Sequence, residues 1–276
     1  MMSNNKRFSF EFFPPKTEAG FTKLEDTWQH LNALNPAFFS VTYGAGGSTR
    51  DNTMAVIKQM RAQGISVAPH LSFGGDDEAS MTALLDEYRD LGVNRIVALR
   101  GDIPSGFGAA RIVYANELVE FIRQHSGDHF HLEVAAYPEI HPESKDYASE
   151  IAFFKQKLDA GANTALTQYF FNADAYFSFV EACTKAGITK PIYPGIMPIT
   201  NFTNLARFSA NCGAEIPRWL KYKIEGLGDD AAAIAEVGQE VIIRLSQQLL
   251  DGGAPGLHFY TMNQLEPTRA IYQAVV

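Results

Sequence analysis

The feature that most constrains the fold is an alternation between short apolar runs and longer helical patterns along the whole chain. Each run has six or seven residues and is bounded by Gly, Pro, Asn or Asp, which is typical of buried strands. The eight runs cover residues 8–13, 38–43, 66–71, 95–100, 131–137, 164–170, 191–197 and 256–262. Eight strands separated by helices favour an α/β fold of the closed (β/α)8 TIM barrel type over an open doubly wound sheet.

The segments between these runs have apolar residues three and four positions apart, which is the period of a helix with one buried face. Leu24, Trp28 and Leu31 show this spacing, and the longest such pattern covers residues 234–249. The region 201–228 is long for one connection and predicts an extra helix near the seventh and eighth strand–helix units. Because no Pro/Ser-rich linker interrupts the chain, we expect one catalytic barrel domain over residues 1–276.

Charge and cysteine content exclude several classes of function. With 23 Lys and Arg residues against 31 Asp and Glu, the formal net charge is −8, and no basic block stands out. Binding of nucleic acid or of a membrane surface as a main task is therefore not expected, and no apolar run approaches the roughly 18 residues of a membrane span. Cys183 and Cys212 fit no disulfide framework or Cys-x-x-Cys pair, so we expect reduced thiols in a cytoplasmic protein.

In a (β/α)8 barrel the active site lies at the carboxyl ends of the strands, and alternate side chains of each strand point into the barrel. In the first run this places Ser9 and Glu11 inside and Phe8, Phe10 and Phe12 against the helices. The inward residues expected from the next four runs are Ser40, Thr42, Ala68, His70, Ala98, Arg100, Asp102, Ala135 and Tyr137. Within each run, the earlier inward residues are small and the later ones are polar. This pattern predicts a wide and polar barrel mouth.

Missing motifs narrow the chemistry of that mouth. No Gly-x-Gly-x-x-Gly follows a strand, and no Walker, His-Glu-x-x-His or Gly-x-Ser-x-Gly motif occurs. The histidines lie on different runs and loops, so we predict no metal site, and the polar residues suit an organic cofactor better. A purely structural interpretation is open for some of them. Glu11 could pair with Arg100 to close the barrel, His70 could bond a backbone carbonyl, and Asp102 could form a turn.

Residues 9–16, Ser-Phe-Glu-Phe-Phe-Pro-Pro-Lys, resemble the opening strand of methylenetetrahydrofolate reductases. The resemblance continues in chain order at residues 40–45, 68–71, 97–102, 135–139, 159–163, 167–171, 194–198 and 258–263. Each motif is short and unspecific alone. Together they cover essentially the whole chain and are highly specific.

The resemblance implies an FAD-dependent oxidoreductase in which NADH or NADPH, with NADH as the expected donor, reduces the flavin by hydride transfer. The reduced flavin then converts 5,10-methylenetetrahydrofolate to 5-methyltetrahydrofolate in a ping-pong sequence, a step of one-carbon metabolism and methionine biosynthesis. By resemblance, Glu11 is the general acid that opens the folate ring, and Asp102 lies between flavin and pterin. The family resemblance also suggests a homo-oligomer.

The same resemblance assigns the binding positions. Those for the flavin are Thr42, Tyr43, Ala45, His70, Arg100, Gly101, Asp102, Tyr114, Ala115, Tyr137, His141, Glu150 and Lys157. Those for the folate substrate are Thr42, Asp102, Gln168, Phe202 and Gln264. Among the flavin positions, the cations Arg100 and Lys157 are suited to the FAD diphosphate.

Three positions depart from the family pattern. Phe153 and Gln156 stand where Asn and Arg are common in the helix after the fifth strand, so aromatic stacking could replace polar contacts to the adenine. Gln264 replaces an Arg that could hold a folate carboxylate. Two alternatives also fit a flavin barrel: another oxidoreductase of the proline dehydrogenase kind, and a flavin- or folate-binding module without turnover.

Overall fold

Eight parallel strands, numbered in chain order, form a closed barrel in the computed structural model. The structure describes residues 6–43, 47–73, 76–101 and 113–276, and of residues 47–49 only the backbone. The strands are β1 Arg7–Phe12, β2 Phe38–Val41, β3 Val67–Leu71, β4 Arg95–Ala98, β5 His131–Ala136, β6 Thr164–Tyr169, β7 Ile192–Ile196 and β8 Gly256–Tyr260. The predicted (β/α)8 TIM barrel is confirmed.

The helices between the strands follow the predicted apolar spacing. They are α1 Glu18–Asn32, α2 Gly47–Ala62, α3 Glu78–Asp90, α4 Ala115–Ser126, α5 Tyr147–Asp159, α6 Ala173–Lys185, α7 Phe202–Cys212, α8 Arg218–Glu225, α9 Ala231–Asp251 and α10 Thr268–Val275. The extra helix expected within residues 201–228 is present, because this region holds both α7 and α8. Asn201 caps α7 by accepting a hydrogen bond from the Asn204 amide, and the helix ends at the left-handed Gly213.

The chain divides into two compact units. One comprises Met1–Phe8, Ala136–Lys155 and Leu166–Val276, and the other comprises Ser9–Ala135 and Gln156–Ala165. We refer to them as the C-terminal unit and the N-terminal unit, after the larger part of each. The expectation of a single catalytic domain stays a prediction.

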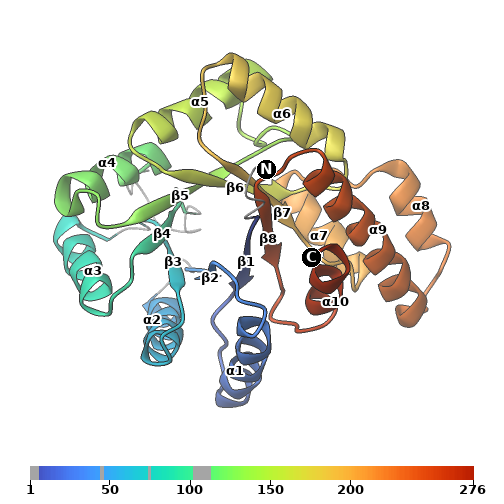
Figure 1. The fold of residues 1–276 in the computed structure, drawn as a ribbon, viewed down its shortest axis with the longest axis horizontal. Helices are drawn as coiled ribbons and strands as arrows, with labels where there is room; N and C mark the ends of the chain where they lie inside the picture. The colour runs from blue at the N-terminus through green and yellow to red at the C-terminus, as the bar shows by residue number, and fades with distance from the viewer. Residues whose placement is uncertain (1–5, 44–46, 74–75, 102–112) are drawn as a thin grey trace, which may run out of the picture. The chain divides into compact units, whose positions relative to one another are not determined.

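In the N-terminal unit, helices α1 to α4 stand outside the strands that they follow (Figure 1). Phe10 and Phe12 stack on Phe39 with ring centroids 5.9 and 5.4 Å apart, so the phenylalanines of β1 pack on one face of the sheet. Glu11 is in register with Ser40, and the side chains of register partners share a face. The predicted alternation is confirmed for Phe10, Glu11 and Phe12 of β1 and for Ser40 of β2.

The alternation predicted for β4 is wrong at Ala98. His70 is in register with Val97, and Leu71 with Ala98. Val97 therefore shares the inward face of His70, and Ala98 lies on the opposite face. Strand alternation fixes the order of faces within one strand, but the register with the neighbouring strand decides which parity points inward.

In the C-terminal unit, helices α7 to α10 are grouped beside β7 and β8 (Figure 1). Thr167 links three strands here: its Oγ1 accepts a hydrogen bond of 2.9 Å from the Gly195 amide, and its carbonyl accepts one of 2.7 Å from the Tyr260 hydroxyl. A Cβ at position 195 would lie 2.5 Å from the Tyr260 ring and 2.2 Å from the Thr167 carbonyl oxygen. Only glycine therefore fits at this point of β7.

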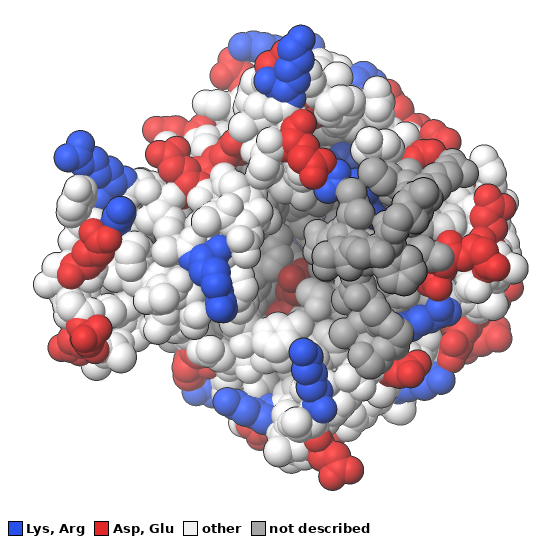
Figure 2. Space-filling model, turned by 180° about the vertical axis from the view of Figure 1, so that it is seen from behind, with Lys and Arg blue, Asp and Glu red and all other residues white. Residues whose placement is uncertain are grey.

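The face of the molecule drawn in Figure 2 carries charges of both signs. Figure 2 shows acidic and basic side chains interspersed over one face, with the visible Lys and Arg residues standing apart from one another. Within the described ranges, no helix combines the length and apolar character that crossing a membrane requires.

Candidate active site

Glu11, near the carboxyl end of β1, is at the centre of a polar cluster in the N-terminal unit. Ser40 donates a hydrogen bond of 3.2 Å to Oε2 of Glu11, and Nε2 of His70 lies 3.1 Å from the same oxygen. The side chains of Glu11 and His70 are only 15% and 11% exposed. β1, β2 and β3 thus bring together a carboxyl group, a hydroxyl and an imidazole, as predicted for Glu11 and His70.

The imidazole of His70 is incompletely satisfied. Although Nε2 is within ion-pair distance of Glu11, it has no aligned hydrogen-bond partner among the described residues. A buried nitrogen in this state is uncommon because desolvation without a hydrogen bond is unfavourable. The nitrogen is therefore suited to a ligand group at the carboxyl ends of β1 to β3.

The two flavin positions after β2 are held by their neighbours. The amide of Thr42 donates to the Phe12 carbonyl at 2.9 Å, and the Thr53 hydroxyl donates to the Thr42 carbonyl at 2.9 Å. The hydroxyl of Tyr43 donates to Asp76 at 3.3 Å. These contacts fix the backbone at 42 and the ring at 43.

Arg50 of α2 completes the Tyr43 cluster by donating to Asp76 at 3.3 Å. Burial, together with the Asp76 carboxylate, raises the pKa of Tyr43, and Arg50 partly opposes this. The phenol therefore stays protonated and remains a donor. Sequence reasoning missed Asp76 and Arg50 because no motif links them; their distance from Tyr43 is visible only in three dimensions.

Gly101 follows β4 in a conformation that requires glycine. Its φ is +78°, and a Cβ would lie 2.6 Å from the Ser72 hydroxyl. Just before it, the Leu99 amide donates to the Leu71 carbonyl at 2.9 Å and so continues the pairing of β3 with β4. Arg100 is partly exposed next to this glycine. Ala45 and Asp102 lie outside the described residues.

The remaining flavin positions of the N-terminal unit are at the start of α4 and the end of α5. Tyr114 is exposed at the N-cap of α4, where its amide donates to Glu117 at 2.8 Å, and Ala115 is the first helical residue. The first amides of a helix point away from it and favour anions. The Lys157 amine donates to the Ala135 carbonyl at 2.6 Å.

In the C-terminal unit, Glu150 is buried beneath the turn that follows β5. It is 2% exposed and accepts hydrogen bonds from the His141 amide at 3.1 Å and the Ser144 hydroxyl at 2.6 Å. The ring of His141 in turn contacts Tyr137 edge to face, with centroids 4.6 Å apart. Glu150 therefore holds the turn that carries His141, and contacts of Glu150, His141 and Tyr137 with the cofactor stay predictions.

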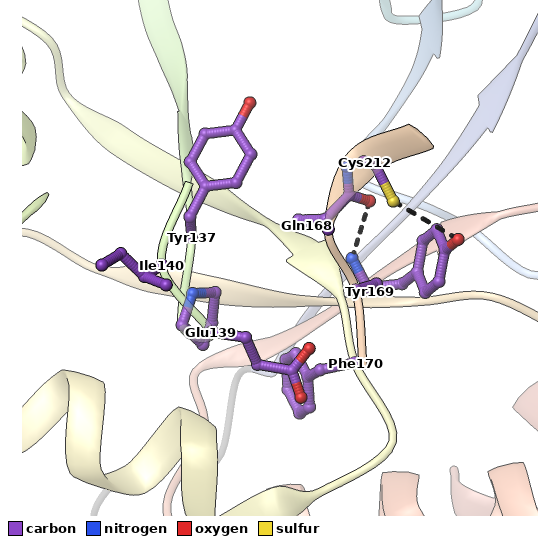
Figure 3. Close-up of a pocket in the computed structure, with 10 residues that line it drawn as sticks. Tyr137, Glu139, Ile140, Gln168, Tyr169, Phe170 and Cys212 are labelled. Carbon is purple, nitrogen blue, oxygen red and sulfur yellow. Dashed lines mark hydrogen bonds between the residues drawn. The ribbon is translucent and has the colours of Figure 1, made fainter. Parts of the chain in front are cut away.

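Gln168 lines a pocket at the end of β6 (Figure 3). The pocket is lined by Tyr137, Pro138, Glu139, Ile140, Gln168, Tyr169, Phe170, Cys212, Gly213 and Ala214. Gln168 folds back so that its Oε1 accepts a hydrogen bond of 3.0 Å from the Tyr169 amide. Glu139 accepts a hydrogen bond of 2.8 Å from the Glu215 amide. Burial raises the pKa of the Glu139 carboxyl group.

The other two substrate positions are more open. Phe202 is partly buried at the first residue of α7, and Gln264 is exposed after β8. The Gln264 amide donates to the Thr261 carbonyl at 3.0 Å across Met262 and Asn263, whose φ angles are 53° and 56°. Two successive left-handed residues closed by this bond match a type I′ turn, which fixes where Gln264 leaves the backbone.

The described residues contain no group of three or more His, Cys, Asp or Glu side chains placed to hold a metal ion. What the structure does bring together at the strand ends is an acid, an imidazole, hydroxyl donors and amides. The fold and these groups define an enzyme of the (β/α)8-barrel class, with its reactive groups at the carboxyl ends of the strands.

Comparison with known proteins identifies the family. A family model described as methylenetetrahydrofolate reductase matches residues 1–276. The 5,10-methylenetetrahydrofolate reductase of Escherichia coli (strain K12) is 39% identical over 264 residues, which cover 95% of this chain and 88% of that protein. The chain belongs to the methylenetetrahydrofolate reductase family and is an enzyme of that kind, which confirms the resemblance noted in its motifs.

Two further relatives carry the name of the same family. The 5,10-methylenetetrahydrofolate reductase of Buchnera aphidicola subsp. Schizaphis graminum is 40% identical over 257 residues, covering 93% of this chain and 87% of that one. A rice (Oryza sativa subsp. japonica) protein named probable methylenetetrahydrofolate reductase (NADH) is 35% identical over 271 residues, covering 93% of this chain and 46% of that one.

Solved structures agree on the fold. A Clostridium thermocellum protein, described as binding two copies of 5-methyl-5,6,7,8-tetrahydrofolic acid, superposes with a TM-score of 0.67 at 16% identity, covering 98% of this chain and 94% of that one. A chain of the tryptophan synthase complex from Pyrococcus furiosus gives 0.52 at 11% identity, with 98% and 96% covered. At these identities the likeness shows the barrel fold alone.

Proposed function

We propose that this chain holds FAD, accepts hydride from NADH in preference to NADPH, and reduces 5,10-methylenetetrahydrofolate to 5-methyltetrahydrofolate. The family implies a flavin and a nicotinamide donor in general, and the printed name of the rice relative favours NADH. The observation that carries the proposal is the Glu11–Ser40–His70 cluster, which combines a carboxyl group with a buried nitrogen suited to a ligand.

The residues present fit a flavin. His70 offers a buried Nε2, and Thr42 and Tyr43, which follow the neighbouring strand β2, are held in place by hydrogen bonds. The amide of Ala115, at the first residue of α4, and the amine of Lys157 are suited to a diphosphate. Bound FAD would supply a reversible hydride acceptor. Phe153, 53% exposed on α5, is available to stack on an adenine.

Glu11 is proposed as the general acid of the folate half-reaction. The methylene bridge of the substrate must open before it can accept hydride, and opening requires a proton at a ring nitrogen. Ser40 and His70 both contact Oε2, so the carboxyl group is held in one orientation within a mostly buried site. Hydride transfer from nicotinamide requires stacking and alignment and no proton from Glu11. The two half-reactions should therefore depend on Glu11 very differently.

Folate is proposed to bind through Gln168 and Phe202, with Gln264 towards the glutamate tail, and the family resemblance adds Thr42 and Asp102 as further folate positions. Gln168 presents an amide at the pocket of Figure 3, and Phe202 an aromatic ring at the start of α7. The Clostridium thermocellum barrel that binds 5-methyltetrahydrofolic acid supports folate as a ligand for this fold. We also propose a cytoplasmic homo-oligomer, as the family resemblance suggests.

The proposal is tested by flavin analysis and rapid mixing of the purified protein. We expect a yellow protein that releases FAD and not FMN on denaturation. Its absorbance should bleach faster with NADH than with NADPH and recover on addition of methylenetetrahydrofolate. Absence of flavin, together with no FAD uptake by the apoprotein, would overturn the cofactor assignment. Bound flavin without NADH oxidation in the presence of menadione would instead identify a binding module.

A further inference from the structure

Helix α7 carries a substrate position at one end and a cluster of hydrogen bonds at the other. Phe202 is its first residue and Cys212 its last, so the two ends are about 15 Å apart at 1.5 Å per residue. The position of Phe202 thus depends on how the far end of the helix is held. The contacts at that end lie within the C-terminal unit and involve the residue next to Gln168.

That residue is Tyr169, whose side chain is buried at the end of β6. Its hydroxyl is 3.1 Å from the Ser209 hydroxyl. It also accepts a hydrogen bond of 3.4 Å from the Cys212 thiol (Figure 3). Ser209 and Cys212 are three positions apart and so lie on one face of α7. Burial raises the pKa of Tyr169 strongly, so the hydroxyl stays protonated and the contact does not depend on pH in the working range.

A second contact holds the chain just beyond α7. Glu139 accepts a hydrogen bond of 2.8 Å from the Glu215 amide. Gly213, with φ of 76°, ends the helix so close to the turn after β5 that a Cβ would lie 2.6 Å from the Pro142 ring. The end of α7 is therefore attached both to β6 and to the turn after β5, and it closes one side of the pocket that Gln168 lines.

We propose that Tyr169 is a positioning residue for the folate site: its hydroxyl fixes the last turn of α7 and thereby keeps Phe202 in place relative to Gln168. Successive side chains of a strand point to opposite faces. Gln168 can thus serve the substrate while Tyr169 serves the helix, and one short segment of β6 sets the distance between the two substrate positions. This inference rests on the proposed function of Gln168 and Phe202.

Tyr169→Phe tests the inference because it removes the hydroxyl and keeps the ring that packs against Phe171 and Tyr260. We expect the KM for methylenetetrahydrofolate to rise about two- to tenfold, the range for losing one neutral hydrogen bond. FAD content and kcat at saturating folate should change little. Ser209→Ala should raise KM in the same direction, and the double variant should show less than the product of the two effects.

Tyr176→Phe is the matched control. Tyr176 is another buried tyrosine of the same unit. Its hydroxyl donates a hydrogen bond of 2.8 Å to the Ile192 carbonyl of β7 and not to a residue of α7. Tyr169→Phe loses the hydrogen bonds with Ser209 and Cys212 and Tyr176→Phe loses the one to Ile192; both variants should lose stability, but only Tyr169→Phe should raise KM. An unchanged KM in Tyr169→Phe, or an equal rise in Tyr176→Phe, would overturn the inference.

A second readout needs no enzyme activity. The chain has two cysteines. Cys183 is 1% exposed, and burial raises its pKa to about 12, so Cys212 should be the thiol that reacts with iodoacetamide. Iodoacetamide should alkylate Cys212 several-fold faster in Tyr169→Phe than in wild type or in Tyr176→Phe. Peptide mass spectrometry measures this rate. Equal rates would show that the hydroxyl does not hold α7. If the wild-type protein fails to reduce methylenetetrahydrofolate, the proposed function is refuted. The alkylation rate of Cys212 still decides, independently of activity, whether the Tyr169 hydroxyl holds the end of α7.

Discussion

Two carboxylates of the N-terminal unit, Glu11 and Glu133, have opposite surroundings. Glu133 is fully buried near the amino end of β5 and accepts a hydrogen bond of 2.5 Å from Arg95, another from Thr164, and lies 3.6 Å from His131. Glu11, near the carboxyl end of β1, is partly exposed and meets a serine and a histidine.

The difference distinguishes a carboxylate that joins strands, Glu133, from one that is suited to catalysis, Glu11. An arginine carries a permanent positive charge, and the contacts of Glu133 with Arg95 and Thr164 join β4, β5 and β6. Around Glu11, a serine and a histidine orient the carboxyl group without the fixed positive charge of a guanidinium beside it. Acid catalysis requires the second kind of site.

The largest effect expected from this comparison is on catalysis by Glu11→Gln. The variant is nearly isosteric and still accepts a hydrogen bond from Ser40, so FAD binding and reduction by NADH should persist. Reoxidation by methylenetetrahydrofolate should fall by about 10²–10⁴-fold, the usual contribution of a general acid, or roughly 2.7–5.4 kcal/mol of barrier. Rapid-mixing absorbance of both half-reactions measures this, and equal losses in the two would assign Glu11 to the fold or the flavin.

The matching change at the other carboxylate, Glu133→Gln, should act on stability instead. It leaves the Arg95 guanidinium in a site built for a carboxylate, and removing one partner of a buried pair costs about 3–5 kcal/mol. Urea unfolding measures the loss, while the rate of folate reduction per folded molecule should stay near wild type. The exposed pair of Glu181 and Lys185 on α6 offers the control, since Glu181→Gln should leave the midpoint unchanged. If both variants unfold alike, the buried pair contributes nothing.

A smaller effect is expected where a charge is added at an exposed position. Gln264→Arg should tighten folate binding by about 1.5–3 kcal/mol if the new guanidinium meets the glutamate carboxylate, while flavin reduction by NADH stays the same. Titration with folates that carry and lack the glutamate tail separates this contact from general charge attraction. Unchanged or weaker binding would show that another residue holds the tail.

The smallest effect concerns Glu139, whose pKa is raised first by burial, with a further contribution from Glu215 and an opposing one from the Glu215 amide. Because the folded protein then binds more protons than the unfolded chain, stability falls as pH rises from the ordinary carboxyl range towards the raised value, and stays lowered above it. Glu139→Gln should lack this slope in chemical unfolding measured from pH 4 upwards. A wild-type slope in the variant would assign the effect to another group.

The fold was largely predictable from the sequence, because the period of apolar residues reports burial directly. The strand runs and the extra helix in 201–228 depend only on local patterns, and so does the inward placement of Glu11. Ala98 was placed on the wrong face because register depends on the neighbouring strand, which a local pattern does not contain.

The site was less predictable wherever partners are far apart in sequence. Tyr169 and Ser209 are 40 residues apart, and Glu133 and Thr164 are 31 apart, so no spacing rule joins them. Family resemblance supplied Gln168 and Glu150 as site positions, but it gave no sign that Glu150 is buried beneath the turn after β5. Only the three-dimensional contacts separate residues that face a ligand from residues that support them.

The contact between Gly195 and Tyr260 has a consequence for how this barrel can evolve or be redesigned. The ring of Tyr260 and the backbone carbonyl oxygen of Thr167 both occupy the volume that any side chain at position 195 would need. A library that randomises position 195 should therefore return almost only glycine. Smaller residues at 260 should not relieve this restriction, because the Thr167 carbonyl belongs to the backbone of β6, and in natural homologues position 195 should stay glycine whatever residue stands at 260.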